Sequence, residues 1–369
     1  MEQKVMKLPR AVVVIIGIFI LAGFLIVMNL VGRVAAEVPA FLSGYTLQFI
    51  SEVGAAVYSL LLLAAFGYLR VLKEKGEGFV KGFYSGGFMT GYCVIMVIAQ
   101  LIVQQTVPDN TLVSPGQIVI FTLTVFLVGF NEEILVRGII LNLFLDRFTN
   151  TRRGVLSAIV LSSLIFGCAH LPNVLSGVPL GSALIQSVQA TLLGVIFAAA
   201  YLRSGNLWIT IILHAVTDFA GLMASGLYGN GTMVDGIGSL SVINLVVTVP
   251  LFLIPCIVLL RPGKLDGIIA ARGGHPLPPT AEDAESMAVT SLILGVFGIF
   301  MGFAGYGAGF AVVGLLGAVS SKKIKPHQNG IATAGLVTSI VGLVIALAVV
   351  ALMLLVLPLL GMDDLMSIL

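Results

Sequence analysis

Long apolar segments separated by short polar stretches dominate the chain, and most of these segments are about 20 residues long. A helix of this length crosses the hydrocarbon core of a bilayer. The pattern therefore predicts an all-α, polytopic transmembrane helical bundle, with about eight spans in a first part and about three in a C-terminal module. The expected spans are 11–32, 46–69, 84–106, 117–145, 154–172, 182–202, 206–226, 240–260, 288–303, 305–320 and 331–359.

The distribution of basic residues predicts how the helices are oriented. The chain is 58% hydrophobic and only 10% charged, so we expect a lipid bilayer around it and no nucleic-acid partner. If the N-terminus is cytoplasmic, all of the 19 lysines and arginines except Arg33 and Arg137 fall on the cytoplasmic side or at its border. We therefore expect a multi-pass protein of the cell membrane, in a bacterium the plasma membrane, with a cytoplasmic N-terminus.

A polar break divides the apolar pattern. Glycine, proline and charged residues replace apolar ones over 262–287, which predicts a mobile cytoplasmic linker. In the tail, small residues such as Gly314 and Gly317 recur at a spacing that lets membrane helices approach closely. The expected organisation is N-terminal helices over 1–115, core helices over 116–260, the linker over 261–287 and a C-terminal helical membrane module over 288–369.

Three ionisable residues interrupt one apolar helix. Glu132, Glu133 and Arg137 lie within the expected span 117–145, where a charged side chain costs roughly 2.5–3.5 kcal/mol. Glu133 and Arg137 are four residues apart and can pair on one helix face, whereas Glu132 points about 100° away. This division favours Glu132 as a general base and the Glu133–Arg137 pair as its support. A structural ion-pair cluster that ties helices together is the alternative.

Two later apolar segments carry the histidines that could work with these acids. His170 ends one segment, and His214 lies four residues before Asp218 in another. Asp218 could hold the His214 ring in one tautomer or bind the substrate itself. Taken alone, each histidine is equally well explained as a hydrogen-bonding residue between helices. Three helices that each offer such a group make a shared site the better interpretation.

The sequence limits the kinds of hydrolytic chemistry available. It has no His-Glu-x-x-His helix and no Gly-x-Ser-x-Gly nucleophile elbow. Activation of water by a glutamate remains, either directly or through a metal. We expect no cofactor, with zinc as the alternative, in which case Glu132, His170 and His214 would be the ligands.

Helix geometry gives an approximate depth for each candidate. At 1.5 Å per residue, Glu132 lies roughly 20 Å and His170 roughly 25 Å from the inner ends of their helices. His214 comes out shallower, at about 12 Å, if its helix starts near Asn206. The first two depths predict a cavity that opens toward the exterior. Glu52 is expected near an outer helix end, at the membrane interface.

The three motifs resemble those of one protein family. The motifs are Glu132-Glu133-x-x-x-Arg137, Phe166-x-x-x-His170 and His214-x-x-x-Asp218, in this order on successive membrane helices. Over about 115–225 they resemble the motifs of the CAAX-protease and bacteriocin-processing (CPBP, or Abi) family. The resemblance implies an intramembrane endopeptidase in which Glu132 with His170 activates water. It also implies that His214 with residue 218 stabilises the oxyanion.

The chain departs from the family pattern at one position, and its tail resembles a different family. The third motif often ends in asparagine, and Asp218, if charged, would be a poor oxyanion donor. Residues 287–346 resemble a small helical membrane domain of unknown function, which implies no activity.

Three functions remain open from the sequence. The first is an endopeptidase that acts on a membrane-associated protein or peptide. In a bacterial setting this would be a leader peptide, a membrane-anchored protein or a regulator rather than a prenylated protein. The second is a transporter or proton relay, because intramembrane carboxylates and histidines also mark ion paths. The third is a non-catalytic membrane scaffold. The sequence identifies neither the substrate nor the oligomeric state.

Overall fold

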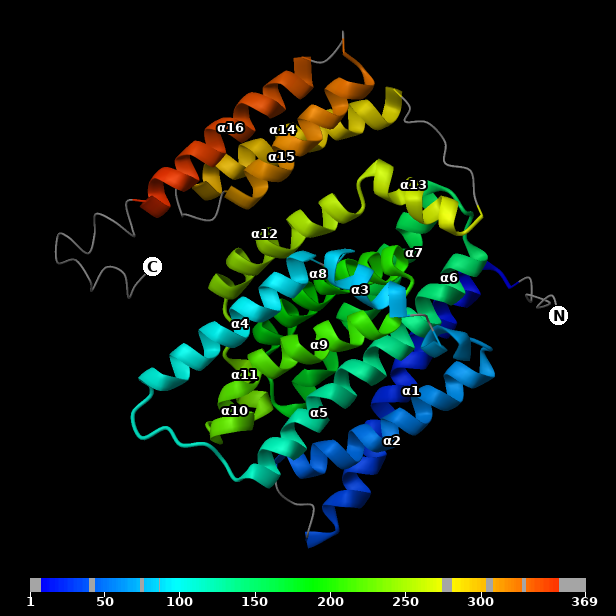
Figure 1. The fold of residues 1–369 in the computed structure, drawn as a ribbon, viewed down its shortest axis with the longest axis vertical. Coiled ribbons are helices and arrows are strands. Elements are labelled where there is room, and N and C mark those ends of the chain that lie inside the picture. Colours follow the sequence, from blue (N-terminus) through cyan, green and yellow to red (C-terminus); the bar gives the residue numbers. More distant parts are fainter. Residues whose placement is uncertain are drawn as a thin grey trace. The chain divides into compact units, whose positions relative to one another are not determined.

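The protein is helical throughout the part of the chain that the structure describes. The computed structural model describes residues 8–39, 44–73, 76–85, 87–273, 281–302, 308–326 and 330–351. Every regular element within these ranges is a helix (Figure 1), which confirms the all-α prediction. Two compact units are present, Met1–Val242 with Gly263–Pro276, and Ile243–Pro262 with Leu277–Leu369.

The first unit contains the helices that carry the candidate residues. Its longer helices are α1 Arg10–Ala36, α2 Gly44–Ala65, α3 Gly76–Ser85, α4 Gly87–Thr106, α5 Pro115–Glu133, α7 Arg152–Cys168, α8 Leu180–Ser204, α9 Leu207–Gly221 and α13 Pro262–Ala271. Short helices connect them: α6 Asn142–Arg147, α10 Met223–Tyr228 and α11 Met233–Gly238, with 3-10 turns at Leu69–Lys73 and Leu171–Ser176. Helix α13 falls within the expected linker, where Arg152 of α7 makes two 2.7 Å hydrogen bonds to Asp266.

The second unit contains α12 Val242–Leu259, α14 Ala281–Gly302, α15 Ala308–Ile324 and α16 Gly330–Ala351. Helices α14, α15 and α16 pack against one another. A Cβ on Gly314 would lie 2.9 Å from the Ser291 carbonyl oxygen, and one on Gly342 would lie 2.7 Å from the Gly298 carbonyl carbon. The close approach that the small residues of the tail predict is therefore present between these helices.

Eight of the described helices are long and apolar enough to cross a membrane. They are Arg10–Ala36, Gly44–Ala65, Gly87–Thr106, Pro115–Arg147, Arg152–Ser176, Leu180–Ser204, Val242–Leu259 and Gly330–Val349. The expected spans 206–226, 288–303 and 305–320 are not among them. Within 206–226, helix α9 ends before Leu222, and α10 begins after it. Within 305–320, helix α15 has only 17 residues.

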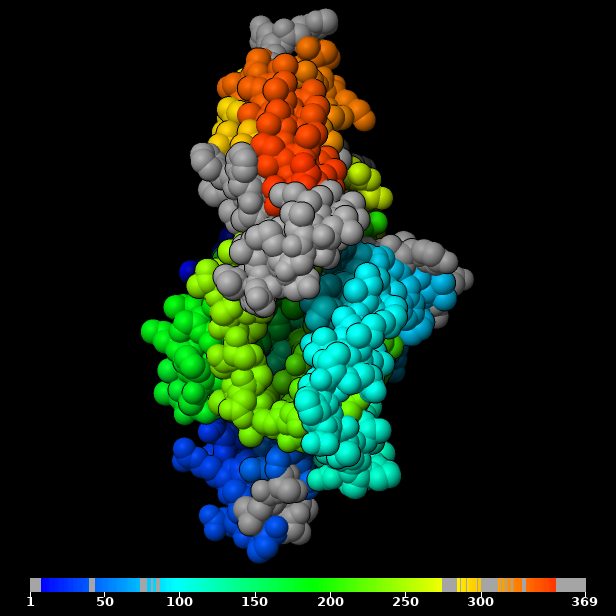
Figure 2. All heavy atoms as spheres, turned by 90° about the vertical axis from the view of Figure 1, so that its left-hand side faces the viewer, coloured from blue at the N-terminus to red at the C-terminus, as the bar shows by residue number. Residues whose placement is uncertain are grey.

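Helix α4 shows how the surface of the first unit suits a lipid environment. It lies at the surface in Figure 2, and three of its apolar side chains, Val94, Ile95 and Ile102, are more than half exposed. Side chains of this kind are stable outside a protein core when hydrocarbon surrounds them. The face is therefore suited to contact with lipid tails.

Helix α5 is shaped by its sequence at both ends. At its start, the Ser114 side chain accepts from the Gln117 main-chain N–H and the Gln117 side chain accepts in return, with Pro115 in the first turn. At its end, the chain continues as a π-helix over Ile134–Leu141. The Asn142 side chain donates to the Arg137 and Gly138 carbonyls, each at 3.0 Å. Such π-helical turns occur often at functional sites.

The entry into α9 is buried. Helix α8 ends at Gly205, whose φ of 69° favours glycine, and Asn206, which caps α9, is only 2% exposed. The indole of Trp208 donates to the Leu72 carbonyl at 3.2 Å. Helix α9 therefore starts inside the protein and not at its surface, and the depth of His214 in the membrane stays a prediction.

Candidate active site

One cavity of about 410 Å³ brings the candidate residues together. Its walls come from α1, α2, α5, α7, α8, α9 and α11, all in the first unit. All four residues expected to be catalytic line it: Glu132, His170, His214 and Asp218. We refer to it as the catalytic cavity, after these candidates.

Glu133 lies behind this wall and joins two of the motifs. It is fully buried, and its Oε1 atom lies 2.5 Å from Arg137 Nη1 and 2.9 Å from His214 Nδ1. The pairing expected between Glu133 and Arg137 is present. The bridge to His214 was not expected, because residues four apart on one helix can be read from the sequence and a contact between α5 and α9 cannot.

His214 points its other ring nitrogen toward the cavity acids. Its Nε2 atom is 3.4 Å from Glu132 Oε2 and 3.6 Å from Asp218 Oδ2. A carboxylate oxygen can only accept, so Nδ1 carries the hydrogen that it donates to Glu133. Glu133 therefore holds the tautomer of His214, a role that the sequence suggested for Asp218.

Two buried phenyl rings enclose the charged pair. The Arg137 guanidinium lies 4.8 Å from the centre of the Phe166 ring and 5.5 Å from that of Phe197. The His214 ring stacks on Phe197 with centroids 5.3 Å apart, and Phe166 contacts both His214 and His170 edge to face. The rings thus hold the arginine by cation–π contact, where few hydrogen-bond partners are available.

His170 is positioned by the end of α7. Its Nδ1 atom lies 3.0 Å from the Phe166 carbonyl oxygen, which can only accept a hydrogen bond. In the neutral ring, Nε2 is therefore the unprotonated nitrogen. His170 lies two residues after the end of α7, at the N-cap position of the 3-10 turn Leu171–Ser176. The spacing of four residues in Phe166-x-x-x-His170 lets the Phe166 carbonyl hydrogen-bond to the histidine while its ring contacts the imidazole edge to face.

Glu52 is a cavity residue that the sequence interpretation misplaced. It is only 2% exposed and lines the catalytic cavity, so its expected position at the membrane interface is wrong. Its carboxylate accepts from Asn131 Nδ2 at 2.9 Å and from Gln48 Nε2 at 2.8 Å, and Asn131 also donates to the Glu52 carbonyl at 3.0 Å. A signal was available, because Glu52 is a carboxylate within an apolar segment, as Glu132 is.

Helix α11 forms a further part of the wall of the catalytic cavity. Met233, Gly236 and Ile237 line the cavity. The helix is held at its start by Thr232, whose hydroxyl and main-chain N–H both donate to Asp235. These hydrogen bonds lower the pKa of the exposed Asp235 carboxyl from its usual value, because they favour its charged form.

The candidate residues were also considered as ligands of zinc. Among the described residues, no three histidine, cysteine, aspartate or glutamate side chains converge as a ligand set. His170 uses Nδ1 for a carbonyl, and His214 uses Nδ1 for Glu133. These hydrogen bonds occupy only Nδ1 of each ring, as is usual in metal-bound histidines, so they do not exclude zinc. The expectation of no cofactor, with zinc as the alternative, stays a prediction.

The contact between α5 and α9 depends on Gly129. A Cβ at this position would lie 2.9 Å from the Ala215 nitrogen and 3.0 Å from the Ile211 carbonyl oxygen, both main-chain atoms that cannot rotate away. We expect Gly129→Ala to separate α5 from α9 and to lower the stability of the protein by about 1–3 kcal/mol. Unfolding in detergent measures this. Gly116→Ala on the same helix is the control, because its Cβ meets nothing within 4 Å; equal stability of the two variants would contradict the role of Gly129.

Comparison with known proteins finds a family model that matches this region. Residues 114–220 match the family model described as type II CAAX prenyl endopeptidase Rce1-like, and all four candidates that line the cavity lie in this range. The chain is a multi-pass membrane protein.

One curated relative is an Escherichia coli protein described as an uncharacterized 24.3 kDa protein. It is 29% identical over 145 residues, which cover 38% of this chain and 58% of the relative. The chain thus spans little more than half the length of that relative. No solved structure matches.

Proposed function

Since residues 114–220 are Rce1-like, we propose that the protein is an intramembrane endopeptidase of the glutamate type. It hydrolyses a peptide bond of a membrane-associated protein or peptide. The observation that supports this most is the convergence of Glu132, His170, His214 and Asp218 on one cavity. Groups that can accept, hold and return a proton there surround a space large enough for part of a peptide.

The proposed reaction begins at Glu132. Its carboxylate accepts a proton from a water molecule, which His170 Nε2 also orients by accepting a hydrogen bond. The hydroxide attacks the substrate carbonyl carbon, so a C–O bond forms and the carbonyl becomes an oxyanion. When the C–N bond breaks, Glu132 returns the proton to the leaving nitrogen. Atoms and charge balance without a further reactant.

His214 is proposed to stabilise the oxyanion. Because its Nδ1 atom donates to Glu133, Nε2 can donate to substrate only when the ring carries both hydrogens. The positive charge of that ring is balanced by Glu133 and by Asp218, whose Oδ2 atom is 3.6 Å from Nε2. In this scheme Asp218 supports the histidine by its charge and need not donate to the oxyanion, which answers the difficulty of an aspartate at this position.

The setting of the reaction is part of the proposal. We place the protein in the cell membrane with a cytoplasmic N-terminus, because that orientation collects the basic residues on one side. The reaction uses no cofactor. The substrate is a protein or peptide at the membrane, in a bacterium a leader peptide, a membrane-anchored protein or a regulator.

The proposal is tested by finding the substrate in cells. Membrane proteomes are compared between a deletion strain that carries the wild-type protein and one that carries the Glu132→Gln variant. Uncleaved membrane proteins should accumulate with the variant, and new chain ends should occur only with the wild type. Identical proteomes would favour a transporter or a scaffold.

A further prediction concerns Glu52 and Asn131. Because Asn131 precedes Glu132 and is tied to Glu52 by two hydrogen bonds, Glu52→Ala and Asn131→Ala should each misplace Glu132. We expect each to lower kcat about tenfold to a hundredfold with KM little changed. The double variant should be no worse than Asn131→Ala, because Asn131→Ala already removes both hydrogen bonds and Glu52→Ala removes only the one to the carboxylate.

Glu52→Gln is the control for that pair. It keeps an oxygen that can accept from Asn131, so most of the activity should return. Strictly additive losses, or no recovery with Glu52→Gln, would show that Glu52 does not act through Asn131.

A further inference from the structure

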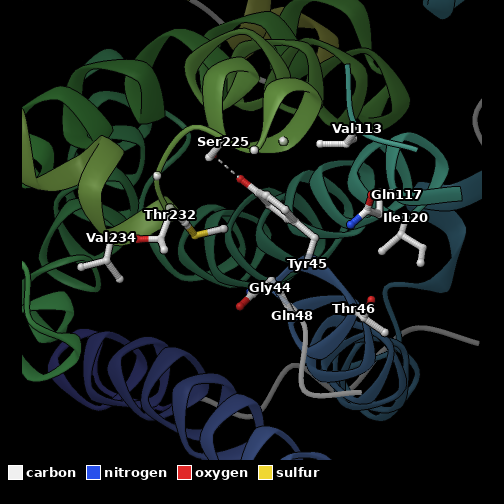
Figure 3. A pocket seen from close by; sticks show the side chains of 14 residues that line it. Gly44, Tyr45, Thr46, Gln48, Val113, Gln117, Ile120, Ser225, Thr232 and Val234 are labelled. Carbon is white, nitrogen blue, oxygen red and sulfur yellow. Dashed lines mark hydrogen bonds between the residues drawn. The ribbon is translucent and has the colours of Figure 1, made fainter. Parts of the chain in front are cut away.

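A second cavity, of about 340 Å³, adjoins the catalytic cavity. Figure 3 shows it between the first turns of α2, the start of α5 and the segment from Ser225 to Val234. We call it the Tyr45 cavity, after the ring that crosses it. Gln48 and Met233 line both cavities, so the two spaces share a wall.

One face of α2 leads from the first cavity to the other. Tyr45, Gln48 and Glu52 follow one another at intervals of three and four residues, which places them on the same side of the helix. Tyr45 lines the Tyr45 cavity, Gln48 lines both, and Glu52 lines the catalytic cavity. Gln48 donates to Glu52 at 2.8 Å, so this face is held as one surface.

The chemistry of the Tyr45 cavity suits an uncharged peptide. Its 14 lining residues include no lysine, arginine, histidine, aspartate or glutamate. Apolar side chains such as Ile120 and Val234 alternate with hydroxyl and amide groups, among them the Tyr45 hydroxyl, 2.7 Å from Ser225 Oγ. Gly229 and Gly231, with φ of 68° and 74°, bring main chain without side chains to the wall. Such a lining supplies no charged side chain to a phosphate or a metal ion.

The separation of the two cavities sets the length of the occupant. Tyr45 and Glu52 are about 10 Å apart along α2, and Ile120 and Glu132 are about 18 Å apart along α5. An extended peptide rises about 3.3 Å per residue, so about three to six residues cover these distances.

We propose that the Tyr45 cavity is a substrate subsite that binds an uncharged stretch of peptide, about three to six residues from the scissile bond. This rests on the proposed endopeptidase function. The substrate then lies along the α2 face, with its scissile bond at Glu132 and its neighbouring segment against Tyr45 and Ile120. Specificity depends on residues remote from the cleaved bond.

The test uses substitutions that fill the cavity. Ile120→Trp and Val234→Trp each place a large ring in the Tyr45 cavity from a different wall. Val119→Trp is the matched control, because Val119 precedes Ile120 on the same helix but is 57% exposed. Each protein in lipid nanodiscs is given a peptide library made from digested bacterial proteins, and the cleavage sites are sequenced.

Wild type and Val119→Trp should prefer uncharged residues about three to six positions from the cut on one side, and both filled variants should lose that preference. For one long library peptide, filling should raise KM about tenfold or more with kcat retained. A peptide shortened to two residues on that side should be cleaved equally by all variants.

The proposal is overturned if wild-type sites show no preference at those positions. It is also overturned if the filled variants affect long and short peptides alike. A wild-type protein that cleaves nothing would instead refute the endopeptidase function, and the subsite with it.

Discussion

Replacement of Glu132 by glutamine is expected to abolish measurable peptide cleavage, with a loss of about a hundredfold to ten-thousandfold in kcat. Glutamine has nearly the same size and can fill the same place in the wall of the catalytic cavity. Its amide cannot accept a proton from water, so the step proposed for Glu132 is lost. The measurement is cleavage of library peptides by purified protein in nanodiscs, followed by mass spectrometry.

Two comparisons make the Glu132 result specific. Glu37→Gln makes the same chemical change at an exposed residue outside both cavities and should leave cleavage unchanged. The amount of Glu132→Gln protein in the membrane should equal that of the wild type, because Glu132 lies at the cavity surface and Glu133, not Glu132, carries the buried ion pair. Retained cleavage by Glu132→Gln would remove the basis of the proposed mechanism.

The largest effect on stability is expected at Arg137. Its side chain is fully buried and lies between Glu133, Phe166 and Phe197. Arg137→Met keeps much of the volume but removes the guanidinium from the buried Glu133 carboxylate, whose remaining partner is His214. Removal of one partner from a buried ion pair costs about 3–5 kcal/mol, which we expect for the free energy of unfolding in detergent.

The expected loss of stability is large because the Glu133–Arg137 ion pair is buried. Glu133→Gln combined with Arg137→Met should restore part of the stability, because the Glu133 carboxylate is then no longer buried without Arg137. Arg152→Met breaks the ion pair with Asp266, whose side chains are 16% and 25% exposed; it should cost at most about 1 kcal/mol. Equal losses for Arg137→Met and Arg152→Met would show that Arg137 supports the fold only by its volume.

Contacts along one helix could be predicted from the sequence, and contacts between helices could not. The Glu133–Arg137 pair follows from a spacing of four residues, and the structure has it. The bridge from Glu133 to His214 joins residues 81 positions apart, and no local pattern specifies such a distance. The same limit explains why Phe197 was not singled out, since one phenylalanine in an apolar helix carries no signal of its own.

The burial of the Glu52 side chain was also predicted wrongly from the sequence. Glu52 was expected at the membrane interface because it lies near a helix end in the sequence. That expectation used the position along the helix and could not use the neighbours of the side chain. In the structure, α2 turns Glu52 toward Asn131 and not toward solvent. The burial of Asn206 at the start of α9 could likewise not be read from the sequence.

The sequence by itself determined the all-α membrane architecture, the motifs and the pairing of Glu133 with Arg137, because these depend on segment length and on local helical spacing. Only the tertiary structure decided which groups share the catalytic cavity, that Glu133 and not Asp218 holds the His214 tautomer, and that Glu52 and the Tyr45 cavity adjoin the site. The reason is that helix packing places side chains from distant parts of the chain within a few ångströms of one another. That placement depends on close contacts such as the one at Gly129, which no periodicity encodes.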